Sequence, residues 1–364
     1  MTVSEFCSFF ENYFPLEFQE DYDNSGLQLG KSNTEIKGIL ITLDVTEDII
    51  DEAIDYGDNF ILSHHPLIFN ELKKIIDANH IEKIIIKAIE NQIAIYSAHT
   101  NIDNNFNGIN HYISKLLKLS NARVLLPASN YLFKLTTYVP ESHINEVRKA
   151  IFEAGAGYID NYDMCSFNSQ GIGTFRPLKN TKPFIGEIEQ INYVNEIKIE
   201  TIVPKYLLKK VINALIQSHP YEEVAYDIYP LLNKYSKVGS GIIAELNNEI
   251  DIFDFFQRIK KTFDIKQIRH SKIIKNNIKK IAICAGSGAF LIKEAIRKKA
   301  DIFITGEIKY HQYFDAEDKI IIIEIGHYES EKLIKNFFYD FLNEKITKFA
   351  IHKSKIDTNP IKYY

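Results

Sequence analysis

Gly38-Ile-Leu-Ile-Thr-Leu-Asp44 and Asn59-Phe-Ile-Leu-Ser63 are two continuous apolar runs in a chain of 364 residues. Continuous apolar runs are typical of parallel strands that are buried on both faces. Between these runs, apolar residues at helical spacing predict a helix over 46–56, which Gly57 ends. A second predicted helix, over 81–91, leads to the strand Ile93-Ala-Ile-Tyr-Ser97. The pattern therefore predicts an α/β sheet with right-handed crossover connections.

The same order of elements recurs near the C-terminus. Strands are expected at 280–284, 301–305 and 320–325, with a helix at 289–299. Glu52-Ala-Ile54 aligns without gaps to Glu294-Ala-Ile296, and this register places the second strand of one half on the second strand of the other. We therefore expect two repeat-related α/β halves that form one domain.

The segment between the halves has a different pattern. Strands and helices are expected there in the order β-α-β-β-α-β, which is the ferredoxin-like arrangement and can fold as a unit of its own. The predicted organisation is a first α/β half at 1–128, an inserted α+β domain at 129–232 and a second α/β half at 233–364.

Composition narrows the class of protein. The chain has 43 Lys and Arg against 48 Asp and Glu, a net charge of −5, and no basic block, which argues against a nucleic-acid partner. Cys7, Cys165 and Cys284 are far apart and form no C-x-x-C pair, which favours a reducing compartment, the cytoplasm, and argues against a thiolate zinc site. No apolar run approaches the roughly 20 residues of a membrane span.

Histidines and acids follow the predicted strands. His64 and His65 follow the second strand, and adjacent side chains in extended backbone point in opposite directions, so each imidazole could face a different metal ion. His99 and Asp103 follow the third strand with the same spacing as His327 and Glu331 in the second half. If a helix begins there, positions i and i+4 lie on one face.

Loops at the carboxyl ends of parallel strands form ligand-binding crevices. Because the two His/acid pairs hold repeat-related positions after such strands, we expect them to meet the His64-His65 pair at one crevice. Surface or structural histidines are the alternative. Nitrogen and oxygen ligands without thiolate favour zinc, iron, manganese or cobalt. Two ions need about eight ligand positions, more than these side chains supply, so water or substrate would fill the rest and a shared water would become more acidic.

Other residues near the predicted strand ends are candidates for supporting roles. Glu307 occupies the repeat position of His65, and His311 follows it at helical spacing, so either could act as an acid or base; a solvated loop acid is the alternative for Glu307. Asp44 ends a strand and could line the site. Gly286-Ser-Gly288 could cradle a phosphate or could be a tight strand-to-helix turn.

Five motifs in this order resemble the Nif-three-like dinuclear metal-centre family, whose longer bacterial members are often named GTP cyclohydrolase type 2 homologues. They are Asp23-Asn-Ser-Gly-Leu-Gln-Leu-Gly30, Ser63-His-His-Pro66, His99-Thr-Asn-Ile-Asp103, Thr305-Gly-Glu307 and the segment from Gly326 to Glu331. Gly171-Ile-Gly-Thr-Phe-Arg-Pro177 and the segment from His219 to Tyr229 are similar to the insert of those members, which resembles trimer-forming PII and CutA modules.

The resemblance implies two divalent transition-metal ions, of zinc, iron or manganese, and a homohexamer built from trimers. The implied metal ligands are His64, His65, Asp103, His327 and Glu331, with His99 beside the metals. Two functions follow as hypotheses. One is a metal-dependent hydrolase of a nucleotide or phosphorylated small molecule, with Glu307 or His311 transferring protons. The other is a non-enzymatic metal-handling or regulatory scaffold.

Overall fold

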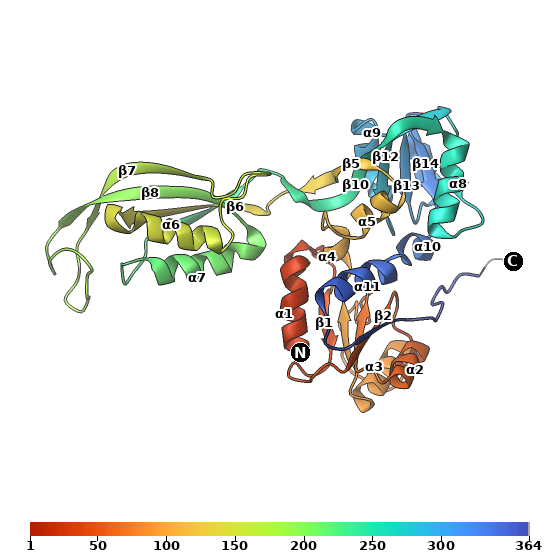
Figure 1. Cartoon of the computed structure of the whole chain (residues 1–364), viewed down its shortest axis with the longest axis horizontal. Helices are drawn as coiled ribbons and strands as arrows, with labels where there is room; N and C mark the ends of the chain where they lie inside the picture. Colours follow the sequence, from red (N-terminus) through yellow and green to blue (C-terminus); the bar gives the residue numbers. More distant parts are fainter. Residues whose placement is uncertain (363–364) are drawn as a thin grey trace. The chain divides into compact units, whose positions relative to one another are not determined.

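The computed structural model describes residues 1–362 and divides the chain into two compact units. One unit is Met1–Pro127 together with the chain from Lys237 onward, and the other is Ala128–Ser236 (Figure 1). The predicted insert at 129–232 lies within the second unit. None of the helices in residues 1–362 has the length and apolar character that crossing a bilayer requires.

The first sheet of the larger unit has five strands. Its order is β1-β4-β3-β2-β15, and the last four of these strands run parallel. The strands are β1 (Gly26–Leu29), β2 (Gly38–Thr42), β3 (Phe60–Ser63), β4 (Ala94–Ser97) and β15 (Ala350–Lys353). Every residue of β2, β3 and β4 is buried, as the continuous apolar runs predict.

Two helices connect these parallel strands where the sequence places them. In α2 (Glu47–Tyr56) the Thr46 side chain accepts a hydrogen bond from the backbone N–H of Ile49, and Gly57 ends the helix in the left-handed conformation with φ 73°. In α3 (His80–Glu90) the side chain of Asn79 caps the first turn in the same way.

The second sheet of this unit has six strands in the order β11-β14-β13-β12-β10-β5. They are β5 (Ser120–Ala128), β10 (Tyr235–Asp251), β11 (Arg269–His270), β12 (Asn277–Cys284), β13 (Ile302–Thr305) and β14 (Ile321–Glu324), with the helices α8 (Ile252–Phe263), η4 (Ala289–Leu291), α9 (Ile292–Arg297) and η5 (Tyr310–Ala316). The parallel run β14-β13-β12 has the same order as β4-β3-β2 in the first sheet.

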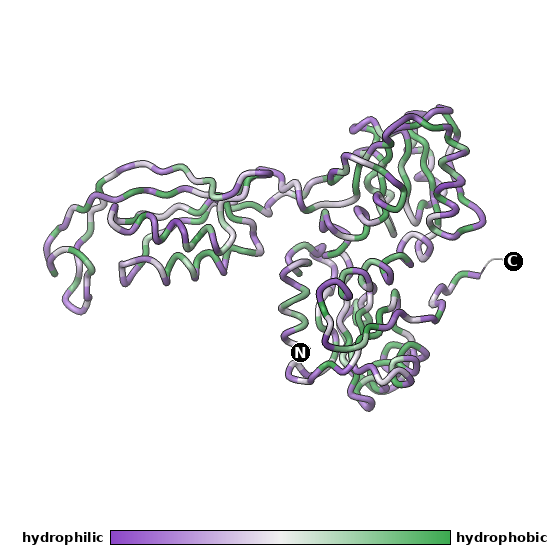
Figure 2. The backbone as a smooth tube through the Cα atoms, in the orientation of Figure 1, coloured by the Kyte–Doolittle hydropathy of each residue, from purple (hydrophilic) through white to green (hydrophobic). Residues whose placement is uncertain are grey.

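A continuous apolar core joins the two sheets. It includes Ile41 of β2 and Ile304 of β13, together with the inner faces of three helices, α1 (Val3–Tyr13), α5 (Ile109–Leu116) and α11 (Ile334–Lys345). The rings of Phe10 and Phe338 lie 6.0 Å apart in it. In Figure 2 the helices alternate between apolar residues, in green, and polar residues, in purple, as expected for helices with one face in a core. The core fixes the strand ends that carry the histidines, because close-packed interiors resist local displacement.

The smaller unit contains β6 (Leu132–Pro140), η2 (Glu141–His143), α6 (Ile144–Glu153), β7 (Ser166–Phe175), β8 (Asn192–Pro204), η3 (Lys205–Leu207), α7 (Leu208–Ser218) and β9 (Tyr226–Leu231). Its antiparallel sheet has the order β7-β8-β6-β9. Helices α6 and α7 lie side by side on one face of the sheet (Figure 1) and enclose a core of their own. The β-α-β-β-α-β order agrees with the expectation from sequence.

Candidate metal centre

Three strands of the larger unit end at the candidate site. His64 and His65 follow β3, the one-turn helix α4 (Thr100–Asp103) follows β4, and α10 (His327–Glu331) follows β14 in the other sheet. The 3₁₀-helix η1 (Leu16–Phe18) packs against α4. The five residues with predicted ligand roles therefore come from both halves of the unit.

Glu331 lies at the centre of this group. Its Oε2 is 3.0 Å from Nε2 of His65 and 3.1 Å from Nε2 of His327, whereas its Oε1 is 3.9 Å from Nε2 of His64. The same His64 nitrogen is 3.8 Å from Oδ1 of Asp103. The two oxygens of one buried carboxylate thus face two different sets of side chains.

The two neighbouring imidazoles are oriented by their Nδ1 atoms. Nδ1 of His64 lies 2.8 Å from the carbonyl oxygen of Ala98 and donates its hydrogen to it. Nδ1 of His65 donates to Oδ1 of Asp44 at 2.7 Å. Such partners fix the tautomer and aim Nε2 of each ring into the cluster, which is how metal-binding histidines are usually held. Asp44 therefore lies behind the cluster, where the sequence predicted a site-lining residue.

Two polar atoms in the cluster are buried without a hydrogen bond. Within residues 1–362, Nε2 of His64 and Oδ1 of Asp103 have no hydrogen-bond partner. A buried polar atom without a partner costs roughly 1–3 kcal/mol, so native structures rarely retain one without a reason. A cation between the imidazole nitrogen and the carboxylate oxygen would satisfy both atoms at once.

The charges of the cluster are strongly coupled. Burial alone would raise the pKa of Glu331, but hydrogen bonds from His327 and His65 hold it well below its ordinary value. Burial would lower the pKa of His65, but hydrogen bonds to Asp44 and Glu331 raise it to about 10, and the bond to Glu331 raises the pKa of His327 to about 9. Protons on these imidazoles therefore balance the carboxylate charge, and divalent cations could replace them.

In the two remaining candidate ligands, His64 and Asp103, burial is the main cause of the pKa shift. Burial lowers the pKa of His64 to about 3, so this imidazole is neutral and can offer a lone pair. Burial also raises the pKa of Asp103 to about 7, and the charge of Glu331 adds to the effect.

His99 is held differently from the expectation based on helical spacing. Its Nδ1 bonds to Oδ1 of Asp23 at 2.7 Å instead of facing Asp103, and Asp23 also accepts the backbone N–H of Thr100 at 3.0 Å. The ring nonetheless stays in the cluster, with its centre 5.3 Å from that of His64. The nearest ligand atoms of His64, His65 and His99 lie within 4.8 Å of one another, as do those of His65, His327 and Glu331.

A cavity of about 240 Å³ opens over the cluster. Its lining includes four residues of the cluster, His99, Asp103, His327 and Glu331, and among the others Tyr22, Asn110, Ser240, Cys284, Ser287 and Phe290. Burial raises the pKa of the Cys284 thiol, so it stays protonated. A small molecule could therefore reach the cluster through this cavity.

The Gly286-Ser-Gly288 segment forms a tight turn against the cluster. Gly286 has φ 65°, and a Cβ atom at this position would overlap Oε1 of Glu331. The backbone N–H of Gly286 donates to Ser330 Oγ at 2.9 Å, and that of Gly288 donates to Thr305 Oγ1 at 3.0 Å. Both backbone N–H groups already donate to side-chain hydroxyls, so neither is free to bind a phosphate. The segment is therefore a tight strand-to-helix turn, and these two groups do not form a phosphate cradle.

Glu307 and His311 have different positions relative to the cluster. Oε2 of Glu307 accepts a hydrogen bond from Ser287 Oγ at 2.9 Å and lies 3.4 Å from Nδ1 of His327. The Ser287 bond, with help from His327, lowers the pKa of Glu307, so this carboxylate is ionised beside the cluster. It is therefore positioned to accept a proton.

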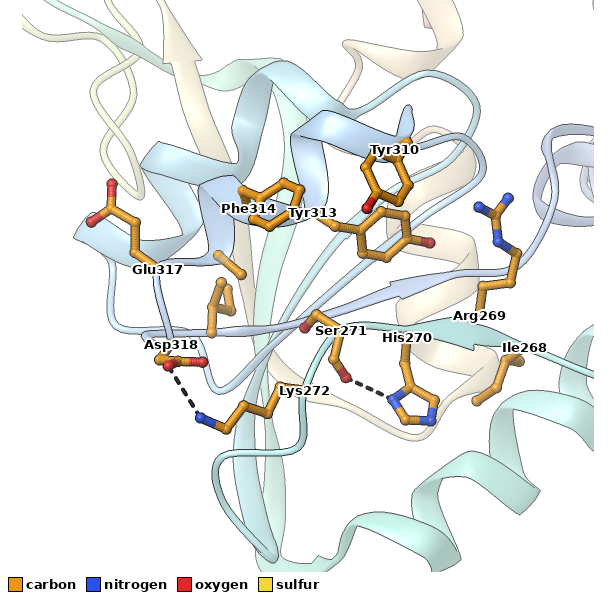
Figure 3. A pocket seen from close by; sticks show the side chains of 12 residues that line it. Ile268, Arg269, His270, Ser271, Lys272, Tyr310, Tyr313, Phe314, Glu317 and Asp318 are labelled. Carbon is orange, nitrogen blue, oxygen red and sulfur yellow. Dashed lines mark hydrogen bonds and ion pairs between the residues drawn. The ribbon is translucent and has the colours of Figure 1, made fainter.

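His311 is an exposed residue of η5, and its ring contacts are with Tyr310 and Phe314. Tyr310 and Phe314 line a separate cavity of about 720 Å³ beside β11 (Figure 3). Among the described residues, no hydrogen bond or ion pair joins His311 to the cluster. Its role in proton transfer stays a prediction.

Comparison with known proteins identifies the family. A family model for Duf34/NIF3 (NGG1p interacting factor 3) matches residues 1–360. The chain belongs to the Duf34/NIF3 family. A relative from Bacillus subtilis (strain 168) named "GTP cyclohydrolase 1 type 2 homolog" is 39% identical over 360 residues, which cover 97% of this chain and 96% of the relative.

Solved structures of NIF3-related proteins agree with this assignment. A Bacillus cereus protein related to NIF3 has a TM-score of 0.85 and 39% identity, with coverage of 100% of this chain and 99% of the other. Staphylococcus aureus protein SA1388 has a TM-score of 0.78 and 29% identity, with the same coverage of both chains. The Duf34/NIF3 fold therefore extends over the whole chain, insert included.

Sequence reasoning missed several residues that hold this Duf34/NIF3 site in place. Thr358, in the C-terminal tail, donates to Oδ2 of Asp44 at 2.6 Å. Ser330 bonds both the Gly286 turn and the carbonyl of His327. Hydroxyl side chains carry no spacing signal, so the sequence pointed to this region only through the His327 and Glu331 pair and the motif around it. Asp23, named in a motif, is the exception because its side chain orients His99.

Proposed function

We propose that the larger unit binds a pair of divalent metal ions that share Glu331. The main supporting observation is that Oε1 of Glu331 faces Nε2 of His64, whereas Oε2 faces His65 and His327. The same His64 nitrogen also faces Oδ1 of Asp103. The buried, partnerless atoms Nε2 of His64 and Oδ1 of Asp103 fit the same proposal. His99 stands beside both sets and could complete either.

The donor set favours particular metals. Imidazole nitrogens and carboxylate oxygens suit zinc, iron or manganese, and the buried Cys284 thiol stays protonated. When bound, such ions act as Lewis acids and lower the pKa of water to about 7, which supports hydrolysis at neutral pH. Asp44, Asp23 and the carbonyl of Ala98 would keep the imidazoles aimed at the ions.

We further propose that the protein is a metal-dependent hydrolase of a nucleotide or a phosphorylated small molecule. The cavity above the cluster admits a small ligand, and the name shared by the curated Bacillus and Staphylococcus relatives, GTP cyclohydrolase 1 type 2 homolog, supports this substrate class. Glu307 would accept a proton at Oε2 and pass it toward solvent, since it is ionised and exposed next to His327.

One observation favours a second function, a non-enzymatic metal-handling or regulatory scaffold. The amides of Gly286 and Gly288, which could have bound a phosphate, are engaged by Ser330 and Thr305. A site that stores or delivers ions needs ligands and access but no group for phosphate. In addition, none of the fifteen residues that line the cavity is Lys or Arg, so the lining offers no permanently cationic side chain to a phosphate.

A substrate panel on the metal-loaded protein separates the two functions. Nucleotides including GTP, phosphoesters and cyclic amides would be incubated with protein loaded with zinc, iron or manganese, and products would be followed by mass spectrometry. Turnover that the Glu331→Ala variant lacks supports the hydrolase. No turnover above that of this variant, with both ions bound in the natural chain, supports the scaffold.

We also propose the finer architecture that the sequence suggested. The insert is a ferredoxin-like module in view of its element order and its β7-β8-β6-β9 sheet, and the matching runs β4-β3-β2 and β14-β13-β12 support two repeat-related halves. A cytoplasmic homohexamer built from trimers through the insert fits three free cysteines and the exposed apolar side chains of Phe167 and Leu232. Light scattering on the purified protein tests the assembly.

A further inference from the structure

The smaller unit contains a cavity of about 720 Å³ that has no part in the metal centre. Its walls come from β7, β8, the segment that follows β7, and the loop between α7 and β9. Two motifs singled out in the sequence, Gly171 to Pro177 and the beginning of the segment from His219, meet there. The size lies within the range of about 300–1,000 Å³ typical of small-molecule pockets.

A buried carboxylate forms part of the cavity wall. Glu196 on β8 is 9% exposed, and its Oε1 accepts a hydrogen bond from the hydroxyl of Tyr221 at 2.8 Å. Its Oε2 has no hydrogen-bond partner among residues 1–362. A Cβ atom on Gly173 would overlap this oxygen, so the glycine keeps the space beside it free. This oxygen is open to the cavity, and an ionised carboxylate oxygen that is free of partners can accept a donor or lie against a cation.

His219 holds Tyr221 against this carboxylate. The backbone N–H of Tyr221 donates to Nδ1 of His219 at 3.1 Å, which leaves Nε2 to donate to the carbonyl of Tyr138 at 3.0 Å. Burial lowers the pKa of His219, in agreement with this neutral tautomer. The His219-Pro-Tyr221 motif therefore builds the wall of the cavity and presets the orientation of Glu196.

Aromatic rings surround the open side of Tyr221. The ring centres of Phe175 and Phe184 lie 6.2 Å and 6.3 Å from that of Tyr221. Aromatic faces grouped around a carboxylate recognise organic cations, because the negative ring faces attract positive charge without demanding hydrogen bonds. Pro177, Leu178 and Ile185 extend the apolar surface.

The charges that line the cavity favour a positive ligand. Glu196, Glu222 and Glu223 outnumber the cations Arg176 and Lys198. Lys198 is in turn paired with Glu200, its Nζ lying 3.4 Å from the carboxylate. No cation–π contact recorded among the described residues occupies the rings of Phe175, Phe184 or Tyr221. The cavity therefore offers uncompensated negative charge next to aromatic faces.

We propose that this cavity binds a small organic cation with an apolar or aromatic substituent, whose charged nitrogen faces Oε2 of Glu196 between the rings of Tyr221, Phe175 and Phe184. The site is separate from the metal centre, and the proposal does not depend on the function of that centre.

Calorimetry on the full-length protein tests the proposal with a set of matched probes. Benzyltrimethylammonium and benzylammonium are the cations, benzyl alcohol is the neutral analogue and phenylacetate is the anion. We expect both cations to bind in saturable fashion at least tenfold more tightly than benzyl alcohol, and phenylacetate not to bind. Absence of saturable cation binding, or equal or tighter binding of the neutral or anionic probe, would overturn the proposal.

Variants locate the site. Glu196→Gln keeps the size of the side chain and an acceptor for Tyr221 but removes the charge, so cation affinity should fall at least tenfold. Glu146→Gln removes the same charge from exposed helix α6, outside the cavity, and should leave affinity unchanged. Phe184→Ala alters an exposed ring and should weaken benzyltrimethylammonium severalfold even if Glu196→Gln fails to fold. Unchanged cation affinity in folded Glu196→Gln, or in Phe184→Ala, contradicts the assignment.

Discussion

Thr358 donates a hydrogen bond of 2.6 Å from Oγ1 to Oδ2 of Asp44, a residue 314 positions earlier in the chain. The other oxygen of Asp44 accepts the Nδ1 hydrogen of His65, and Nε2 of His65 faces Glu331. Asn359, the next residue in the tail, donates to Glu329 on α10 at 3.1 Å. The C-terminal tail thus bonds to one residue beside the cluster in each half of the larger unit, Asp44 in the first and Glu329 in the second.

Removal of the Thr358 hydroxyl should weaken metal binding. In Thr358→Val, Asp44 loses a donor and holds His65 less firmly, so we expect affinity to fall by up to about tenfold, less than the roughly 10–100-fold expected for Asp44→Asn. Competition with a chromophoric chelator measures both. Thr358→Ser keeps the hydroxyl and should bind metal as the natural chain does. Equal affinities for the valine and serine variants would exclude a role for the tail.

The two ligand sets should be separable by mutation. His64 belongs to the set at Oε1 of Glu331 and His327 to the set at Oε2, so His64→Ala and His327→Ala should each retain about one ion, whereas Glu331→Ala should lose both. Elemental analysis of protein purified without oxygen gives the metal content. Full loss of both ions from each single-histidine variant would show one cooperative site in place of two.

Glu307 should affect turnover without affecting metal content. Its contacts are with Ser287 and Nδ1 of His327, not with the atoms that face Glu331. If it transfers a proton, Glu307→Gln should lower kcat by about 10²–10⁴-fold while metal content stays unchanged. Ser287→Ala is the matched control for the hydrogen bond and should have a much smaller effect. Full activity of Glu307→Gln would remove Glu307 from the mechanism.

The metal centre should survive removal of the insert. All candidate ligands lie in the larger unit, which has its own apolar core, so replacing residues 129–232 with a short Gly/Ser linker should leave metal content intact. The insert-free protein should also become smaller in light scattering if the insert assembles the trimers. A folded insert-free protein that binds no metal would show that the insert supports the site.

The strands were predictable because apolar runs leave a periodic signal, and ligand candidates could be named because they hold fixed positions after the strands. Apolar runs identify β2 and β3, and His64, His65, His327 and Glu331 follow strand ends. The finer network was not predictable, since side-chain partners far apart in sequence carry no such signal. His99 bonds to Asp23 because η1 packs against α4 and the loop that follows η1 carries Asp23 to His99. The sequence indicates only that Gly286 is a turn residue, whereas the structure shows that a side chain at this position would overlap Glu331.

Metal stoichiometry of the natural chain beside Glu331→Ala tests the central claim most directly. Both proteins would be purified without oxygen, incubated with zinc, iron or manganese, freed of excess ions and analysed by mass spectrometry. Shared coordination by the two oxygens of Glu331 predicts about two ions per natural chain and nearly none in the variant. A natural chain that stays nearly free of metal under all three conditions, or a folded Glu331→Ala variant that retains both ions, would contradict the account.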